Sequence, residues 1–219
     1  FINNELENVV IKIDQKNLYN LELQRQIKKN INTNSISDFS KASLKKEKIN
    51  YDIKMRIKGD RSLHWYDKDQ SSYKIDLRGE KRVWGLEEFS LQKPITRNYI
   101  YEYVFHKLLE ANKLISLKYF FINLSLNDTD QGIYAVEEGF SKELIERNKK
   151  RNGPIFGLEE SFGVSYPDVK YDLYSKEYWE NNQGELIKIA LSKLERLKYN
   201  KVNINEIFDI EKWATFFAV

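Results

Sequence analysis

Strict alternation of apolar and polar residues marks two segments of the chain as half-buried strands. In residues 51–58 the apolar positions are Tyr51, Ile53, Met55 and Ile57. In residues 73–78 they are Tyr73, Ile75 and Leu77. Paired with their apolar faces in register, the two strands form a hairpin with a long polar tip. Its outward face carries five basic and two acidic side chains, and it is either a solvated sheet face or a roof over a phosphate group.

Further elements follow from hydrophobic periodicity and turn residues. Strands are predicted at residues 7–14, 89–92, 118–126 and 131–138, the last two joined by a turn of Asn and Asp residues. Residues 15–30 are predicted to form a helix or a turn-rich crossover, and the polar residues 30–48 a loop. Later helices are predicted after Ser141, at residues 184–199 and from Asp209.

A long helix is predicted over residues 97–112, with Thr96 as its N-cap. Its apolar residues fill about half of the circumference and should face the core; they are Ile100, Tyr101, Val104, Phe105, Leu108, Leu109 and Ala111. Glu102 falls at the rim of this arc, where it can reach inward to a basic partner. His106 lies in the polar arc and is expected at the surface.

These elements predict an α+β protein in two parts. Residues 1–138 form an antiparallel, β-rich part into which the helix 97–112 is inserted. Residues 139–219 form a helical part. The chain begins without an initiator Met and ends inside an amphipathic helical pattern without a C-cap signal, so we expect a fragment of a longer protein.

Composition excludes several classes of site. The 219 residues include no Cys, which rules out disulfides and thiolate chemistry, and the net charge of +3 is too small to indicate nucleic-acid binding. No apolar run is long enough for a membrane span. The only histidines are His64, expected in an exposed loop, and His106, and no glycine-rich phosphate-binding motif occurs.

The order of the predicted elements, by contrast, favours a phosphate-binding function. A basic hairpin with a long tip precedes a helix with an inward-leaning acid, and a second hairpin then leads into a helical part. Protein kinases use this arrangement, because a strand lysine, a helix glutamate and a glycine-containing loop together hold the nucleotide phosphates. Hydrogen-bond donors and positive charge must converge from a rigid sheet to bind a triphosphate.

Six segments in the same order resemble the spore coat protein H (CotH) kinase family, from about residue 7 to the end of the chain. They are "MRIKGDRS", "SYKIDL", "VWGLEEFSLQKP", "TRNYIYEYVFHKLLEA", "LKYFFINLSLNDTDQGIYAVEE" and "FSKELIERNKKRNGPIF". The resemblance implies a bacterial, atypical protein kinase with a two-lobed kinase-like fold, secreted or at the cell or spore surface. It also implies ATP and Mg²⁺ as cofactors and a coat or surface protein as phosphoacceptor.

The resemblance also assigns nucleotide-binding residues. Lys74 in "SYKIDL" would steady the phosphates, and the loop that covers them would contain Gly59, Arg61 and Ser62. Arg97 and Asn98 match the family's "R-N" pair, and Glu138 matches the acid that ends "G-x-Y-x-x-x-E". Glu102 is expected to partner Lys74 on the ground of helix geometry alone.

Two departures affect this assignment. Asp60 and Arg61 stand where the family often has Asn and Ser, so an acid lies beside the phosphates unless Arg61 pairs with it. The family's catalytic and metal-binding aspartates lie beyond the helix that ends at Val219, so no catalytic or metal-binding residue is expected in these 219 residues. A catalytically inactive surface or spore-coat assembly module of the same fold stays open as the alternative. A carbohydrate-active enzyme is a third and weaker possibility.

Overall fold

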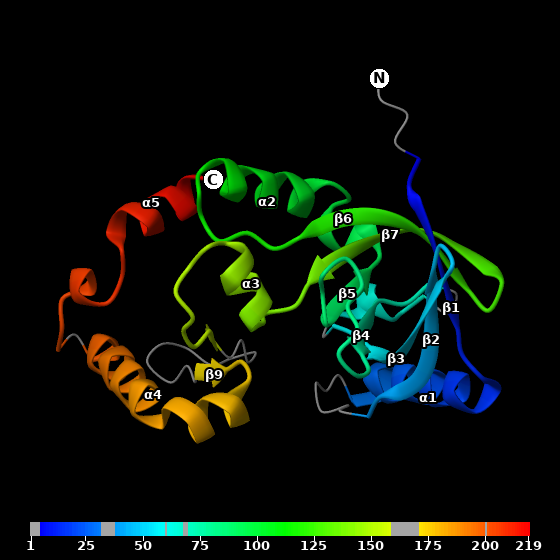
Figure 1. Ribbon diagram of the computed structural model, residues 1–219, viewed down its shortest axis with the longest axis horizontal. Coiled ribbons are helices and arrows are strands. Elements are labelled where there is room, and N and C mark those ends of the chain that lie inside the picture. Colours follow the sequence, from blue (N-terminus) through cyan, green and yellow to red (C-terminus); the bar gives the residue numbers. More distant parts are fainter. Residues whose placement is uncertain (1–4, 32–37, 60, 68–69, 159–170, 200) are drawn as a thin grey trace. The chain divides into compact units, whose positions relative to one another are not determined.

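The computed structural model describes residues 5–31, 38–59, 61–67, 70–158, 171–199 and 201–219 (Figure 1). Contacts between residues divide the chain into two compact units. The first consists of Phe1–Lys107 and Leu117–Gly139, and the second of Leu108–Ser116 and Phe140–Val219.

The first unit is built on a sheet that closes into a barrel (Figure 1). Its strands are β1 (Glu7–Lys12), β2 (Ser40–Lys46), β3 (Ile49–Ile57), β4 (Tyr73–Leu77), β5 (Glu88–Gln92), β6 (Tyr119–Leu126) and β7 (Thr129–Glu138). They follow the order β1-β2-β3-β4-β5-β7-β6, and the barrel closes where β6 pairs with β1 in parallel. The other neighbouring strands are antiparallel. The predicted α+β class and β-rich first part are confirmed.

The interior of the barrel is the main hydrophobic core. Ile53 and Met55 of β3 and Ile75 of β4 are fully buried, as their alternation predicts. Phe89 and Leu91 of β5 are 1% and 0% exposed, so this strand also points its side chains into the same core. Full burial of such a side chain stabilises the fold by about 1.5–3 kcal/mol. The hairpin of β3 and β4 is therefore held chiefly by its inward face.

Strand β2 corrects the prediction of a loop at residues 30–48, of which residues 32–37 lie outside the described part. It pairs with β3 along its whole length, from Ser40 opposite Met55 to Lys46 opposite Ile49. Its sequence, SKASLKK, buries only Ser40 and Leu44, so no apolar alternation marks it as a strand. Its conformation is fixed by backbone pairing with β1 and β3 rather than by its own side chains.

Residues 15–30, for which a helix and a crossover were both possible, belong to the helix α1 (Gln15–Ile31). Two adjacent turns of this helix bury polar side chains, namely Gln24, Arg25 and Lys28. The Gln24 side chain accepts a hydrogen bond from the Ile57 backbone N–H at 3.0 Å and donates one to the Asp38 carbonyl at 2.8 Å. The helix is thereby bound to the end of β3.

Helix α2 (Tyr101–Ala111) begins four residues later than predicted. It follows the 3₁₀ turn η2 (Pro94–Arg97), after which Asn98 and Tyr99 both take left-handed backbone angles. Thr96 is therefore no helix cap, and its hydroxyl donates instead to the Lys93 carbonyl at 2.7 Å.

The predicted orientation of α2 is correct for Leu109, which is 2% exposed, but wrong for most of the other apolar residues. Ile100, next to its start, is 57% exposed, and Tyr101 in its first turn is 69% exposed. His106, predicted at the surface, is only 7% exposed. The side of the helix that bears Glu102 and His106 is thus covered, because these two side chains take part in polar contacts with the barrel unit.

The second unit is mainly helical. It contains α3 (Lys142–Arg147), α4 (Lys176–Lys198), α5 (Ile210–Ala218) and a small hairpin of β8 (Phe156–Leu158) and β9 (Tyr171–Leu173). The predicted start near Asp209 is confirmed, since this side chain accepts a hydrogen bond from the Lys212 N–H at 3.2 Å. Helix α4 begins before the predicted residue 184 and is kinked at Gln183. None of the helices in the described ranges has the length and apolar character needed to cross a membrane.

Candidate anion-binding site

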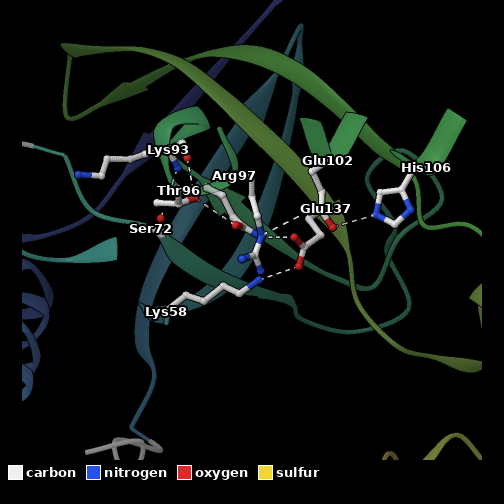
Figure 2. A network of polar contacts seen from close by, with 9 residues as sticks. Lys58, Ser72, Lys93, Thr96, Arg97, Glu102, His106 and Glu137 are labelled. Carbon is white, nitrogen blue, oxygen red and sulfur yellow. Dashed lines mark hydrogen bonds and ion pairs between the residues drawn. The ribbon is translucent and has the colours of Figure 1, made fainter. Parts of the chain in front are cut away.

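A polar cluster forms where the ends of β3, β5 and β7 meet η2 and α2 (Figure 2). Its central contact is between Lys58, the residue after β3, and Glu137 near the end of β7. Lys58 Nζ lies 2.8 Å from Glu137 Oε1, and the two side chains are 23% and 14% exposed. Gln92, the last residue of β5, also donates a hydrogen bond to Glu137. One carboxylate therefore joins three strands.

The surroundings of Lys58 disfavour the charged form of its side chain. Burial lowers the pKa of its ammonium, and the nearby Glu137 carboxylate partly opposes this effect. The positive charges of Arg97 and Lys74 lower the pKa further. Three cationic side chains thus lie close enough to repel one another, although each also has one acidic neighbour, Glu137, Glu88 or Glu102. Such a group attracts a multiply charged anion, because the anion relieves this repulsion.

A second chain of contacts runs from η2 into α2. Arg97 Nε lies 3.8 Å from Glu102 Oε2, and Glu102 Oε1 lies 3.4 Å from His106 Nε2. His106 is fixed from its other side, because its Nδ1 accepts a hydrogen bond from the Leu117 N–H at 3.3 Å. The two contacts together fix the orientation of the imidazole ring, with its Nε2 toward Glu102.

This arrangement favours the ionised form of Glu102. The hydrogen bond with His106 lowers the pKa of Glu102, burial raises it, and the charge of Arg97 lowers it again, with a net decrease. Glu102 does reach inward to a basic partner, as the helix pattern predicts. That partner is Arg97 rather than Lys74.

Lys74 lies on β4 directly opposite Arg56 of β3. Its Nζ is 2.8 Å from Oε2 of Glu88 on β5, and each of these side chains is about one-third exposed. Within the described residues, Lys74 and Glu102 form no ion pair. Lys74 is thus placed by its sheet neighbour, and its proposed contact with phosphate remains a prediction.

The predicted phosphate-covering loop begins at Gly59. This residue has a φ of 89°, and a Cβ at this position would lie 2.3 Å from the His64 ring, so only glycine fits. The Lys28 ammonium donates to the Gly59 carbonyl at 2.9 Å. His64 is 5% exposed, which corrects its predicted place in the solvent.

Arg61 and Ser62 of the same loop are exposed, and Ser62 begins the 3₁₀ turn η1 (Ser62–His64). Asp60, whose pairing with Arg61 is the condition for the phosphate-covering assignment, lies outside the described residues. Asn98 is also exposed, in a left-handed conformation.

Glu138 is only 3% exposed, and its carboxylate connects two strands. Its Oε2 accepts a hydrogen bond from the Lys118 N–H at 2.7 Å, which joins the end of β7 to the start of β6. Of the predicted residues, the structure therefore brings together Arg97 and Glu102, with Lys74 close by, and places Glu138 beside Glu137 on β7.

Sequence reasoning missed Lys58, Gln92 and Glu137 as members of this cluster. Lys58 directly precedes Gly59, and Glu137 directly precedes Glu138, so each neighbours a residue that was singled out. Lys58 directly follows β3 and Glu137 is an outward residue of β7, and only the strand order β3-β4-β5-β7 brings these two strand ends to the same side of the sheet. No group of potential metal ligands is found among the residues with described placement.

The comparison with known protein families agrees with the resemblance found in the sequence. The family model described as CotH kinase protein matches residues 55–219, about three-quarters of the chain. The match begins at β3 and so includes every member of the polar cluster. No curated protein matches the chain at a significant level.

Proposed function

Since this chain belongs to the CotH kinase family, we propose that the complete protein transfers the γ-phosphate of ATP to a hydroxyl group of a protein substrate. The observation that carries the proposal is the proximity of Lys74 and Arg97 to Lys58, which directly precedes Gly59. A nucleotide triphosphate supplies the negative charge that such a group of cations favours.

Within this proposal the barrel unit is the nucleotide-covering lobe of a kinase-like fold. Lys74 and Arg97 contact phosphate oxygens. Glu88 orients Lys74, and Glu102 orients Arg97. Lys58 is held in the same way by Glu137. Gly59, Arg61 and Ser62 cover the phosphates, while Asn98 and Glu138 lie at the border of the nucleotide site.

The described residues fit the phosphates of ATP but offer no cluster of ligands for a metal ion. By family resemblance, the aspartates that bind Mg²⁺ and activate the acceptor hydroxyl lie beyond Val219. The proposal therefore concerns the complete protein. A coat or surface protein, outside the cell or on the spore, is the proposed phosphoacceptor.

Calorimetric titration of the complete protein with Mg·ATP tests the first step. We expect saturable binding with one nucleotide per chain, and transfer of radiolabelled γ-phosphate to a protein hydroxyl. If the complete protein has no affinity for nucleotide, the kinase proposal is wrong. In that case the alternative applies, namely a surface or spore-coat assembly module that keeps the fold, and replacement of Lys74 would leave its assembly unchanged.

A further inference from the structure

A concave site separate from the polar cluster lies in the barrel unit. It has a volume of about 730 Å³, within the range of pockets that hold small organic ligands. Its walls are mainly apolar and aromatic, contributed by Leu63, Tyr66, Tyr99, Ile100, Phe121 and Ile133. Several of these side chains are more than half exposed, among them Tyr66 at 71% and Tyr99 at 60%. The pocket thus offers apolar contact area that the described chain leaves uncovered.

Lys93 is one of the residues that line this apolar pocket. The residue is only 7% exposed, and its backbone is fixed because its N–H donates to the Ser72 hydroxyl at 3.3 Å. Figure 2 shows its side chain pointing away from Arg97, Glu102 and Glu137. Lys93 therefore contributes no charge to the candidate anion-binding site.

Few polar contacts offset the loss of hydration of the buried Lys93 ammonium. Its Nζ lies 4.0 Å from Oδ2 of Asp67, and the Asp67 side chain is 51% exposed. Its ammonium donates no hydrogen bond to any residue in the described ranges. Burial lowers the pKa of Lys93, against the weaker opposing effect of Asp67. A cation that is desolvated in this way gains strongly from an anion that enters the pocket.

From these observations we propose that the pocket binds an organic acid with an apolar, preferably aromatic, body and a single anionic group that pairs with Lys93. The apolar walls accept the body, and the length of the Lys93–Asp67 contact leaves the ammonium available. A polyanion fits less well, because Lys93 is the only cation among the described lining residues and Asp67 repels additional negative charge.

Two fluorescent probes with the same ring system test the proposal on the complete protein. 1-Anilinonaphthalene-8-sulfonate carries one negative charge, and N-phenyl-1-naphthylamine is its uncharged counterpart. We expect Lys93→Gln to weaken binding of the sulfonate by about tenfold or more, the usual effect of losing a charged hydrogen bond. Binding of the uncharged amine should be little changed.

Two further variants test whether the probes bind in this pocket. Lys45→Gln removes an exposed lysine of β2 and should leave both affinities unchanged. Ile133→Trp adds bulk at a half-exposed position of the wall and should weaken both probes, without the risk that replacement of a buried residue brings to folding.

The outcomes separate this proposal from the kinase proposal. Equal losses for both probes in Lys93→Gln, or no loss for the sulfonate, would overturn the assignment of Lys93. Displacement of the sulfonate by ATP would assign the pocket to the nucleotide and also overturn it. A protein that binds the sulfonate through Lys93 but has no affinity for ATP would contradict the kinase proposal alone.

Discussion

Lys58 and Glu137 stand 79 residues apart in the sequence, yet their side chains form an ion pair of 2.8 Å. The contact spans the sheet from β3 to β7, with β4 and β5 between them in the strand order. Gln92 at the end of β5 donates to the same carboxylate. The ends of three strands are therefore linked by one largely buried acid. The pairing of these strands thus fixes the position of Lys58.

The first prediction concerns the stability of this ion pair. Lys58→Met should lower the free energy of unfolding by about 1–3 kcal/mol, because the Glu137 carboxylate loses a charged partner while it stays largely buried. In the double variant Lys58→Met with Glu137→Gln, the second change should cost much less than it does alone. Urea denaturation of the four proteins in this cycle gives the coupling energy.

A matched control is the ion pair of Lys142 and Glu146 on α3, which is 3.2 Å long but more than half exposed at both side chains. Its coupling energy should be only about 0.3–0.5 kcal/mol, as for exposed helix pairs. Similar coupling energies for the two pairs would mean that burial does not strengthen the Lys58–Glu137 contact.

The second prediction is a pH dependence that arises from Glu102. Its pKa is lower in the folded protein than in the unfolded chain, so the folded state prefers the ionised carboxylate. The resulting stabilisation is fully present above the unfolded pKa of about 4.3 and is lost as the pH falls through the lower folded value. Glu102→Gln should therefore lose less stability than the parent protein on acidification.

Thermal unfolding of both proteins over a series of pH values from neutral to acid checks this expectation. Glu110→Gln, at an exposed position of the same helix, separates the effect of Glu102 from a general effect of removing a charge from α2. Parallel stability curves for Glu102→Gln and the parent protein would show that the contact with His106 does not stabilise the ionised acid.

Much of the barrel could be predicted from sequence, because its central strands bury one face. The period-two patterns of β3 and β4 place Ile53, Met55 and Ile75 in the core, and the structure confirms it. Strand β2 lacked this signal, since lysines occupy its outward positions and Ser40 takes an inward one. Its position depends on backbone pairing with β1 and β3, and no pattern in its own sequence indicates that pairing.

The candidate site was harder to predict than the fold for a related reason. Hydrophobic periodicity predicted that the apolar side of α2 faces the core. In the structure the side that carries His106 is covered, and Ile100 is exposed. On the covered side Glu102 contacts Arg97, which lies in a separate 3₁₀ turn, so the periodicity of α2 alone could not indicate this contact. The pairing of Lys58 with Glu137 likewise depends on the long-range pairing of β3, β4, β5 and β7.

The third prediction tests the fit of the loop around Gly59. Gly59→Ala places a Cβ 2.3 Å from the buried His64 ring and imposes a φ of 89° on an alanine. Backbone strain of about 1–2 kcal/mol and overpacking of about 1–3 kcal/mol should both lower stability. Gly79→Ala is the control, because Gly79 has a φ of 74° but no atom within 4 Å of the added Cβ.

Urea denaturation should therefore rank Gly59→Ala below Gly79→Ala, with the difference equal to the overpacking term. Equal losses would mean that the His64 ring moves aside freely. That outcome would contradict the view that Gly59 fixes the start of the loop that is proposed to cover the phosphates.

The last prediction separates nucleotide binding from folding at Lys74. In the complete protein, Lys74→Ala should weaken the binding of Mg·ATP by roughly 1–3 kcal/mol, the usual contribution of a charged hydrogen bond. Its stability should fall by less than about 1 kcal/mol, because the Lys74–Glu88 pair is about one-third exposed at both ends. Calorimetric titration and urea denaturation measure the two effects, with Lys45→Ala on β2 as the exposed-lysine control. Unchanged nucleotide affinity in a folded Lys74→Ala protein would remove Lys74 from the site and leave Lys58 and Arg97 as its cations.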